Sequence, residues 1–186
     1  LTIIFLSILL VILLIIGLLE SRSHAYSLNK IPNRIQVNGA RGKSSVVRLI
    51  ASGIRESGQK VIAKTTGSSP RIINQEGEDI KIHRLRSASI GEQVRLIKNF
   101  SKQNIDHLVI ECMAVQPQYQ WISEQKMLQS TINVITNVRP DHLDEMGYDL
   151  ESIALSLSNT IPYNSTFITA EEKIIEPLKQ VSEERN

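Results

Sequence analysis

The chain has 186 residues, with 21 Lys and Arg, 19 Asp and Glu, four His and one Cys, and its formal net charge is +2 at pH 7. This near-neutral balance argues against bulk nucleic-acid binding, and the lone Cys112 excludes an intrachain disulfide. Every charged side chain lies in residues 20–186, so residues 1–19 carry none. We therefore expect two parts, one suited to a lipid bilayer and one to water.

Residues 1–19 are predicted to form a transmembrane anchor, because only Thr2, Ser7 and Gly17 among them are not hydrophobic. A helix of this length extends about 28 Å, close to the ~30 Å thickness of a bilayer's hydrocarbon core. One alternative is a cleaved signal peptide with a cleavage site near residues 23–25, although the basic segment that normally precedes such a peptide is missing. Another is a buried helix of a soluble protein.

Basic residues follow the apolar segment and none precedes it, as Arg22, Lys30 and Arg34 show. The positive-inside tendency then places the rest of the chain in the cytoplasm, where ATP is available. We expect a single-pass protein of the cell membrane, with a polar juxtamembrane linker at residues 20–33 and one domain at residues 34–186.

Strands and amphipathic helices are predicted to alternate along residues 34–186. The expected strands are residues 34–38, 60–64, 107–112, 131–137 and 166–169. The expected helices are residues 43–57, 121–128 and 150–160, together with a helix that starts at a capping box in residues 89–92 and runs through Phe100. Residues 72–82 are expected to form a hairpin or excursion. This order predicts an α/β fold with a mostly parallel sheet, in which ligands bind at the carboxyl ends of the strands.

The sequence Gly39-Ala40-Arg41-Gly42-Lys43-Ser44 lies between an expected strand and an expected helix. In that position backbone N–H groups and the helix N-terminus can bind phosphate oxygens, Lys43 can neutralise phosphate charge, and Ser44 can ligate Mg²⁺. The strict Walker pattern would have glycine at position 37, where this chain has Val37, so only the shorter G-x-x-G-K-S form is present. The alternative is a glycine turn that has only a structural role.

Two other strand ends carry polar groups. Glu111 ends the apolar run at residues 108–110, where a carboxylate is costly unless it is exposed, paired or bound to a metal. Residues 136–144, T-N-V-R-P-D-H-L-D, concentrate hydrogen-bonding and metal-binding groups, although a turn interrupted by Pro140 is an alternative. Cys112 is expected to be a small packed residue rather than a nucleophile.

These three motifs, at residues 39–44, at Glu111 and at residues 136–144, resemble the ATP-binding central domain of the Mur ligase superfamily, which includes folylpolyglutamate synthases. A narrower resemblance is to the ligase-subunit family of membrane-associated poly-γ-glutamate synthases, of the PgsB/CapB type. The segments that carry it are N-G-A-R-G-K-S-S at 38–45, K-T-T-G at 64–67, I-G-E-Q at 90–93, E-C-M-A-V at 111–115 and I-P-Y-N at 161–164.

The resemblance implies roles for individual residues. Catalysis would involve Lys43, Glu111 and His142, and Mg²⁺ would be coordinated by Ser44, Glu111 and His142. The nucleotide-binding residues that it implies are Gly39, Ala40, Arg41, Gly42, Lys43, Ser44, Ser45, Asn137 and Asp141. Residues 64–67 are a candidate for contact with the acceptor or the γ-phosphate, with a plain turn as the alternative. Arg71 is a candidate for binding a substrate carboxylate, with a solvated surface arginine as the alternative.

The implied activity is ATP-dependent formation of γ-glutamyl amide bonds in a capsule polymer, through an acyl phosphate. Its partners would be glutamate, the growing poly-γ-glutamate chain and other membrane subunits of the synthase and export complex. The alternatives are a P-loop ATPase or kinase of other specificity, and a non-catalytic membrane-tethered fragment that binds nucleotide.

Two departures from the family qualify the implied roles. Many Mur-type ligases have a carbamylated lysine about fifteen residues after the D-H pair, but this chain has no Lys between Lys126 and Lys173. The C-terminal domain of the family is also expected to be absent, so the chain is expected to be the front part of an enzyme.

Overall fold

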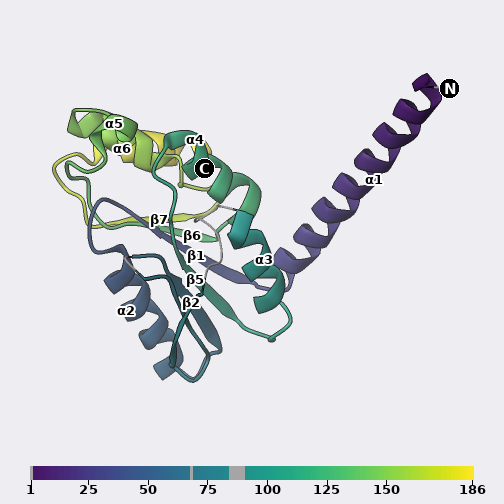
Figure 1. Cartoon of the computed structure of the whole chain (residues 1–186). Coiled ribbons are helices and arrows are strands. Elements are labelled where there is room, and N and C mark those ends of the chain that lie inside the picture. Colours follow the sequence, from purple (N-terminus) through teal and green to yellow (C-terminus); the bar gives the residue numbers. More distant parts are fainter. Residues whose placement is uncertain (1, 68, 84–90) are drawn as a thin grey trace.

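The computed structural model describes residues 2–67, 69–83 and 91–186. Its centre is a seven-stranded sheet with the order β4-β3-β2-β5-β1-β6-β7 (Figure 1). Strands β2, β5, β1, β6 and β7 are parallel, whereas β3 and β4 run antiparallel at one edge. The strand bounds are β1 Asn33–Asn38, β2 Val61–Thr65, β3 Arg71–Ile73, β4 Asp79–Lys81, β5 His107–Glu111, β6 Ile132–Ile135 and β7 Thr166–Thr169.

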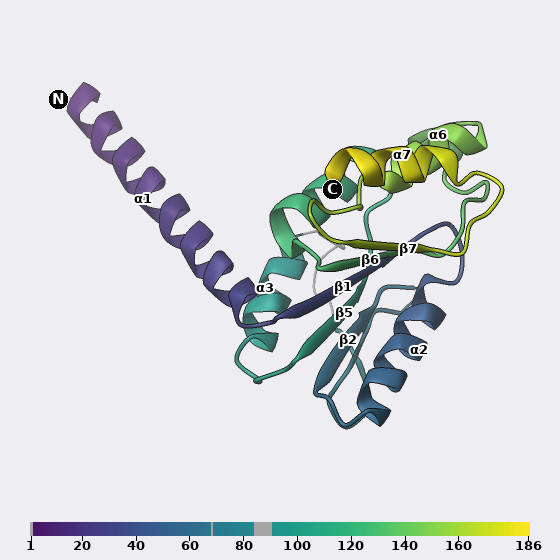
Figure 2. The ribbon, with the colours of Figure 1, turned by 180° about the vertical axis from the view of Figure 1, so that it is seen from behind.

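Helices cover both faces of this sheet. Helix α2 lies on one face, and α3, α4, α6 and α7 lie on the other (Figures 1 and 2). The helix bounds are α1 Thr2–Asn29, α2 Lys43–Glu56, α3 Gly91–Phe100, α4 Pro117–Ile122, the π-helix η1 Ser123–Leu128, α5 Leu143–Met146, α6 Leu150–Ser158 and α7 Glu176–Arg185. The predicted α/β fold with a mostly parallel sheet is therefore confirmed.

The hydrophobic core consists of three clusters of buried side chains. Below α2, Val47 and Ala51 pack on Val37 and Val109 of the sheet. On the opposite face, α3 packs on β2 and β5, and α5, α6 and α7 pack on β6 and β7. The regular apolar spacing along each helix explains this arrangement, because residues three or four apart lie on the same side of a helix.

One of the expected helices differs in its start and in its form. The helix expected at residues 121–128 begins earlier, at Pro117, which suits a first helical turn because proline has no N–H to donate. It then widens into η1, where the Gln129 N–H donates to Glu124 O at 2.8 Å. The left-handed conformation of Gln129, with φ of 48°, ends it. The proposed capping residue Ser89 lies outside the described residues.

The segment expected to be a juxtamembrane linker is helical as far as Asn29, because α1 continues past the apolar residues. Tertiary packing explains the extension, since Leu28 is buried in one cluster with Ile97 and Phe100 of α3. The Arg34 guanidinium also donates to the carbonyl oxygens of Leu28 at 3.2 Å and Ile31 at 2.6 Å. The first bond satisfies a carbonyl at the helix end that has no partner within the helix, and the second holds the residues that follow the helix.

The N-terminal part of α1 projects from the domain without packing on another element (Figures 1 and 2). Its large hydrophobic side chains from Ile3 to Leu19 are all exposed. By length and composition α1 can cross a membrane. Its most apolar stretch of 18 residues is 0% buried in the structure. A soluble core helix would be mostly buried, so the exposure argues against that alternative.

The buried carboxyl group of Glu124 is expected to make stability depend on pH. One of its oxygens accepts from the Ser130 N–H at 2.6 Å, and burial raises the Glu124 pKa from 4.5 to about 8. Because the folded pKa lies above the unfolded one, burial of the neutral group stabilises the fold fully below pH 4.5, and this contribution is lost as the pH rises through 8.

The thermal midpoint of the chain in detergent should therefore fall between pH 5 and pH 8, and Glu124→Gln should remove much of that fall. The control is Glu183→Gln on the exposed side of α7. If wild type and Glu124→Gln lost stability equally over this range, Glu124 would not be the responsible group.

Candidate nucleotide and metal site

The loop at residues 39–44 connects β1 to α2, and two glycines determine its path. Gly39 has φ of 130°, and a Cβ added there would lie 2.1 Å from Thr136 Oγ1 and 2.9 Å from Thr136 N. Gly42 has φ of 82° and stands directly before the first turn of α2. Both positions therefore favour glycine, because side chains are rarely accommodated at positive φ.

The end of β6 holds this loop in place. The Ala40 N–H donates to Asn137 O at 3.1 Å, and the Arg41 N–H donates to Asn137 Oδ1 at 3.1 Å. In return, the Asn137 amide and the Thr136 hydroxyl donate to Arg41 O at 3.0 and 2.8 Å. Asn137 thus acts on the loop backbone and fixes its shape.

Lys43 places its ammonium group over the same loop. Its Nζ donates to Gly39 O at 2.6 Å and to Ala40 O at 3.4 Å. Lys43 also begins α2, where the N–H groups of the first turn and the helix dipole favour anions. The loop, the ammonium group and the helix end together form a site suited to phosphate.

Ser44 and Glu111 meet beside the loop although they lie far apart in sequence. The Ser44 hydroxyl donates to Glu111 Oε2 at 2.7 Å, and the Thr66 N–H donates to the same oxygen at 2.8 Å. A Cβ on Gly67 would lie 3.5 Å from Ser44 Oγ. The carboxyl ends of β1, β2 and β5 therefore converge on one point, and the hydroxyl and carboxylate oxygens there are the type of ligand that Mg²⁺ prefers.

Asp141 and His142 follow the end of β6, and Asp141 contacts the phosphate loop through Arg41. Asp141 Oδ1 is 3.2 Å from the Arg41 guanidinium and 4.0 Å from His142 Nε2. His142 has φ of 46°, precedes α5 and has a half-exposed side chain. Within residues 2–67, 69–83 and 91–186, no hydrogen bond or ion pair joins His142 to Ser44 or Glu111, and no three His, Cys, Asp or Glu side chains form a metal-binding group.

The sequence analysis also discussed Cys112, Lys64 and Arg71, and the structure shows the surroundings of each. Cys112 is buried, and burial raises the pKa of its thiol to about 11, which confirms that it is a packed residue. Lys64 is fully buried, with its Nζ 3.4 Å from Glu92 Oε1. Arg71 begins β3, next to the edge strand β4, and its partly exposed side chain is 3.3 Å from Asp79 of that strand.

A cavity of about 500 Å³ adjoins the loop at the carboxyl ends of β6 and β7. Residues 136–140 line one side, and the sequence analysis missed the other side, which residues 170–173 form. There Glu171 accepts a hydrogen bond from the Val138 N–H at 2.9 Å, and this bond holds the Glu171 pKa below its usual value. The sequence feature that could have indicated this side of the cavity is the acidic pair Glu171 and Glu172, which closely follows the expected strand at residues 166–169.

Substitution of Gly39 by alanine is expected to destabilise the protein by more than ~2 kcal/mol, because the new methyl group would overlap Thr136 at positive φ. Gly53→Ala is the matched control, since nothing lies within 4 Å of a Cβ at that position in α2. There we expect up to ~1 kcal/mol of stabilisation from better helix propensity. Thermal unfolding of both variants checks the prediction, and equal midpoints would contradict it.

Comparison with known proteins identifies similar sequences. Residues 37–185 match the family model of the Mur ligase middle domain. The chain is 44% identical over 179 residues to the capsule biosynthesis protein CapB of Bacillus anthracis, an alignment covering 95% of this chain and 38% of that protein. It is 39% identical over 178 residues to the PGA synthase CapB of Bacillus subtilis, covering 94% of this chain and 45% of that protein. The chain thus spans less than half the length of these curated relatives.

Similar folds are found among solved structures. Escherichia coli FolC in complex with DHPP and ADP superposes with a TM-score of 0.68 at 16% identity, over 89% of this chain and 44% of that one. The bifunctional folylpolyglutamate synthase/dihydrofolate synthase of Yersinia pestis, complexed with AMPPNP and a Mn ion, gives a TM-score of 0.70 at 15% identity, again over 89% and 44%. At these identities the likeness concerns the fold alone.

Proposed function

Since the chain belongs to the Mur ligase family, through a middle domain at residues 37–185, we propose that it is the ATP-binding part of an amide ligase that forms γ-glutamyl bonds in poly-γ-glutamate. The resemblance drawn from its motifs is thereby confirmed at the level of the family. The similarity to a capsule biosynthesis protein and a PGA synthase supports the choice of polymer.

The observation that carries the proposal is the convergence of three strand ends on the phosphate loop. The 2.7 Å bond between Ser44 and Glu111 lies directly beside Lys43, at the sheet edge where parallel α/β proteins bind ligands. The solved structures of similar fold hold ADP or AMPPNP, which supports ATP as the nucleotide.

In the proposed reaction, a carboxylate oxygen of a glutamyl group attacks the γ-phosphorus of ATP, and ADP leaves. The amine of another glutamate then attacks the acyl carbon, phosphate leaves, and the nitrogen loses a proton to give the amide. Lys43 and the N–H groups at the start of α2 hold the phosphoryl oxygens in line and offset the charge on them. Because no covalent enzyme nucleophile is required, the buried and protonated Cys112 is consistent with this route.

Ser44 and Glu111 fit a divalent cation, because a hydroxyl and a buried carboxylate already lie 2.7 Å apart beside the phosphate loop. Bound Mg²⁺ supplies positive charge that neutralises the phosphates. The Thr66 N–H orients the Glu111 carboxylate for this role. The Mn ion of the similar Yersinia pestis structure supports divalent metal use.

His142 is a third candidate ligand, and its substitution tests that role. If it contributes to the metal site, His142→Ala should raise the Mg²⁺ concentration needed for half-maximal ADP release by about tenfold. The matched control is His83→Ala, in the exposed segment after β4. A Mg²⁺ titration identical to that of wild type would remove His142 from the site.

The proposal places α1 across the cell membrane and the ligase domain in the cytoplasm. The exposed apolar side chains of α1 support its placement in the membrane. The basic residues after Leu19 support the cytoplasmic position of the ligase domain. A ligase held at the membrane would deliver its polymer directly to the other membrane subunits of the synthase and export complex.

Release of ADP with and without glutamate tests the function. The assay would use the protein at its natural full length in detergent, together with its membrane partners, and would be repeated with the 186-residue chain. Glutamate-stimulated, Mg²⁺-dependent release is the expected result. Hydrolysis that ignores glutamate would favour a P-loop ATPase or kinase, and ATP binding without turnover would favour a non-catalytic fragment.

A further inference from the structure

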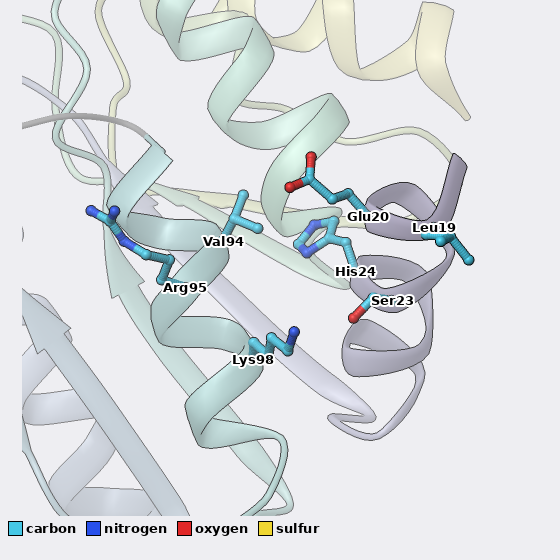
Figure 3. Close-up of a pocket in the computed structure, with 7 residues that line it drawn as sticks. All are labelled: Leu19, Glu20, Ser23, His24, Val94, Arg95 and Lys98. Atoms are coloured by element: carbon cyan, nitrogen blue, oxygen red, sulfur yellow. The ribbon is translucent and has the colours of Figure 1, made fainter. Parts of the chain in front are cut away.

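A second cavity, of about 470 Å³, lies between α1 and α3, far from the phosphate loop (Figure 3). Both helices supply polar and apolar side chains to it. Its lining consists of Leu19, Glu20, Ser23 and His24 from α1, and Val94, Arg95 and Lys98 from α3.

The position of this cavity along α1 coincides with the end of the apolar segment. Leu19 is the last residue of that segment, and Glu20 is the first charged residue of the chain. At 1.5 Å per residue, Ser23 and His24 lie about 6 to 8 Å beyond Leu19 along the helix axis. If residues 1–19 span the hydrocarbon core, the cavity lies in the headgroup layer, which is roughly 5 to 8 Å thick on each side.

The two walls of the cavity are fixed relative to each other. Leu28 of α1 is buried together with Ile97 and Phe100 of α3. His24 Nε2 lies 2.7 Å from Met127 O, which ties α1 to η1 as well. The space is therefore part of the folded domain and does not depend on a mobile segment.

The charges in the cavity favour an anion. Figure 3 shows Lys98 extending toward α1 and His24 extending toward α3, while the Arg95 guanidinium points away from α1. Lys98 and Arg95 form no ion pair with another described residue. With one carboxylate, from Glu20, the formal charge of the lining is +1 when His24 is neutral.

One acceptor in the lining, the Glu20 carboxylate, favours a ligand that also carries hydroxyl groups. Because a carbonyl oxygen only accepts, His24 Nε2 must carry a proton, so Nδ1 of the neutral ring is an acceptor. This Nδ1 is buried and has no hydrogen-bond partner among the described residues, so it lies out of reach of a ligand in the cavity.

We propose that this cavity binds the headgroup of an anionic glycerophospholipid of the phosphatidylglycerol type. Lys98 pairs with the phosphate, the positive charge of Arg95 adds to the attraction at longer range, and Glu20 accepts hydrogen bonds from the glycerol hydroxyls. Leu19 and Val94 provide the apolar surface where the acyl chains begin. The inference rests on the membrane placement of α1 given above, and it adds a specific lipid as a ligand of the protein.

The test counts lipid adducts on the whole chain by native mass spectrometry from detergent, during titration with phosphatidylglycerol or phosphatidylcholine. We expect the first phosphatidylglycerol to bind at least about tenfold more tightly than phosphatidylcholine. The double variant Arg95→Gln/Lys98→Gln should lose about tenfold in phosphatidylglycerol affinity. Lys81→Gln/Lys179→Gln, which removes the same charge from exposed positions elsewhere, should bind as wild type does.

Three results would overturn the proposal. The first is equal affinity for phosphatidylglycerol and phosphatidylcholine, and the second is an equal loss of phosphatidylglycerol affinity in both double variants. The third is displacement of the lipid by inorganic phosphate at the same concentration as the lipid itself, which would indicate a site for small anions. Carbonate extraction of membranes distinguishes a failure of the lipid assignment from a failure of the membrane placement of α1, on which it rests. A chain released by carbonate contradicts the membrane placement, whereas a retained chain without lipid preference contradicts only the cavity assignment. ADP release tests the ligase function independently of both.

Discussion

Replacement of Lys43 by alanine is expected to lower glutamate-stimulated ADP release by about 100- to 1,000-fold. The Lys43 ammonium group lies over the phosphate loop, where it contacts the carbonyl oxygens of Gly39 and Ala40. Alanine removes the positive charge that would stabilise the transferring phosphoryl group. The loop itself should persist, because Asn137 and the two glycines determine its shape.

The control for this variant is Lys179→Ala, an exposed lysine on α7 that should leave the rate unchanged. Circular dichroism and the thermal midpoint would show whether the Lys43 variant is folded. A folded Lys43→Ala protein with normal ADP release would remove the phosphate loop from the mechanism, and the proposed ligase activity would lose its principal support.

Glu111→Gln is expected to raise the Mg²⁺ concentration needed for half-maximal activity by at least about tenfold. The amide keeps one oxygen that can accept hydrogen bonds from Ser44 and the Thr66 N–H, so the local structure should largely survive. It loses the negative charge that would bind a divalent cation. The expected defect is therefore in metal affinity, and saturating Mg²⁺ should restore part of the activity.

Glu183→Gln, on the exposed surface of α7, is the matched control for Glu111→Gln. Titrations of ADP release with Mg²⁺ and with Mn²⁺ would measure the shift for each variant. A Glu111→Gln protein that is folded and has an unchanged titration would show that Glu111 only orients the loop through Ser44 and Thr66.

Local features of the sequence were sufficient to predict most secondary structure. The period of apolar residues located α2 and α6, and short apolar runs between turn residues located β1 and β5. The phosphate loop was recognisable because its glycines meet a local requirement: Gly39 and Gly42 both have positive φ. Such signals depend only on residues that are close in sequence, so they can be read from one sequence without a structure.

Prediction was weaker where a distant contact decides the outcome. The extension of α1 to Asn29 depends on the burial of Leu28 against α3, which nothing in residues 20–33 encodes. Glu171 was missed because its partner, the Val138 N–H, lies on another strand end. The grouping of His142 with Ser44 and Glu111 came from the family resemblance and stays a prediction, since in the structure His142 Nε2 lies 4.0 Å from Asp141 Oδ1.

By itself the sequence determined an apolar segment long enough to cross a membrane, an alternating α/β order and a phosphate loop, because each depends on local composition, spacing or backbone conformation. Only the tertiary structure decided that β5 lies between β2 and β1, which brings Glu111 to Ser44. It also decided that α1 packs on α3 and encloses a cavity at the end of the apolar segment. The physical reason is that strand order and helix docking follow from burying apolar surface between residues far apart in the chain, and no local pattern records those pairings.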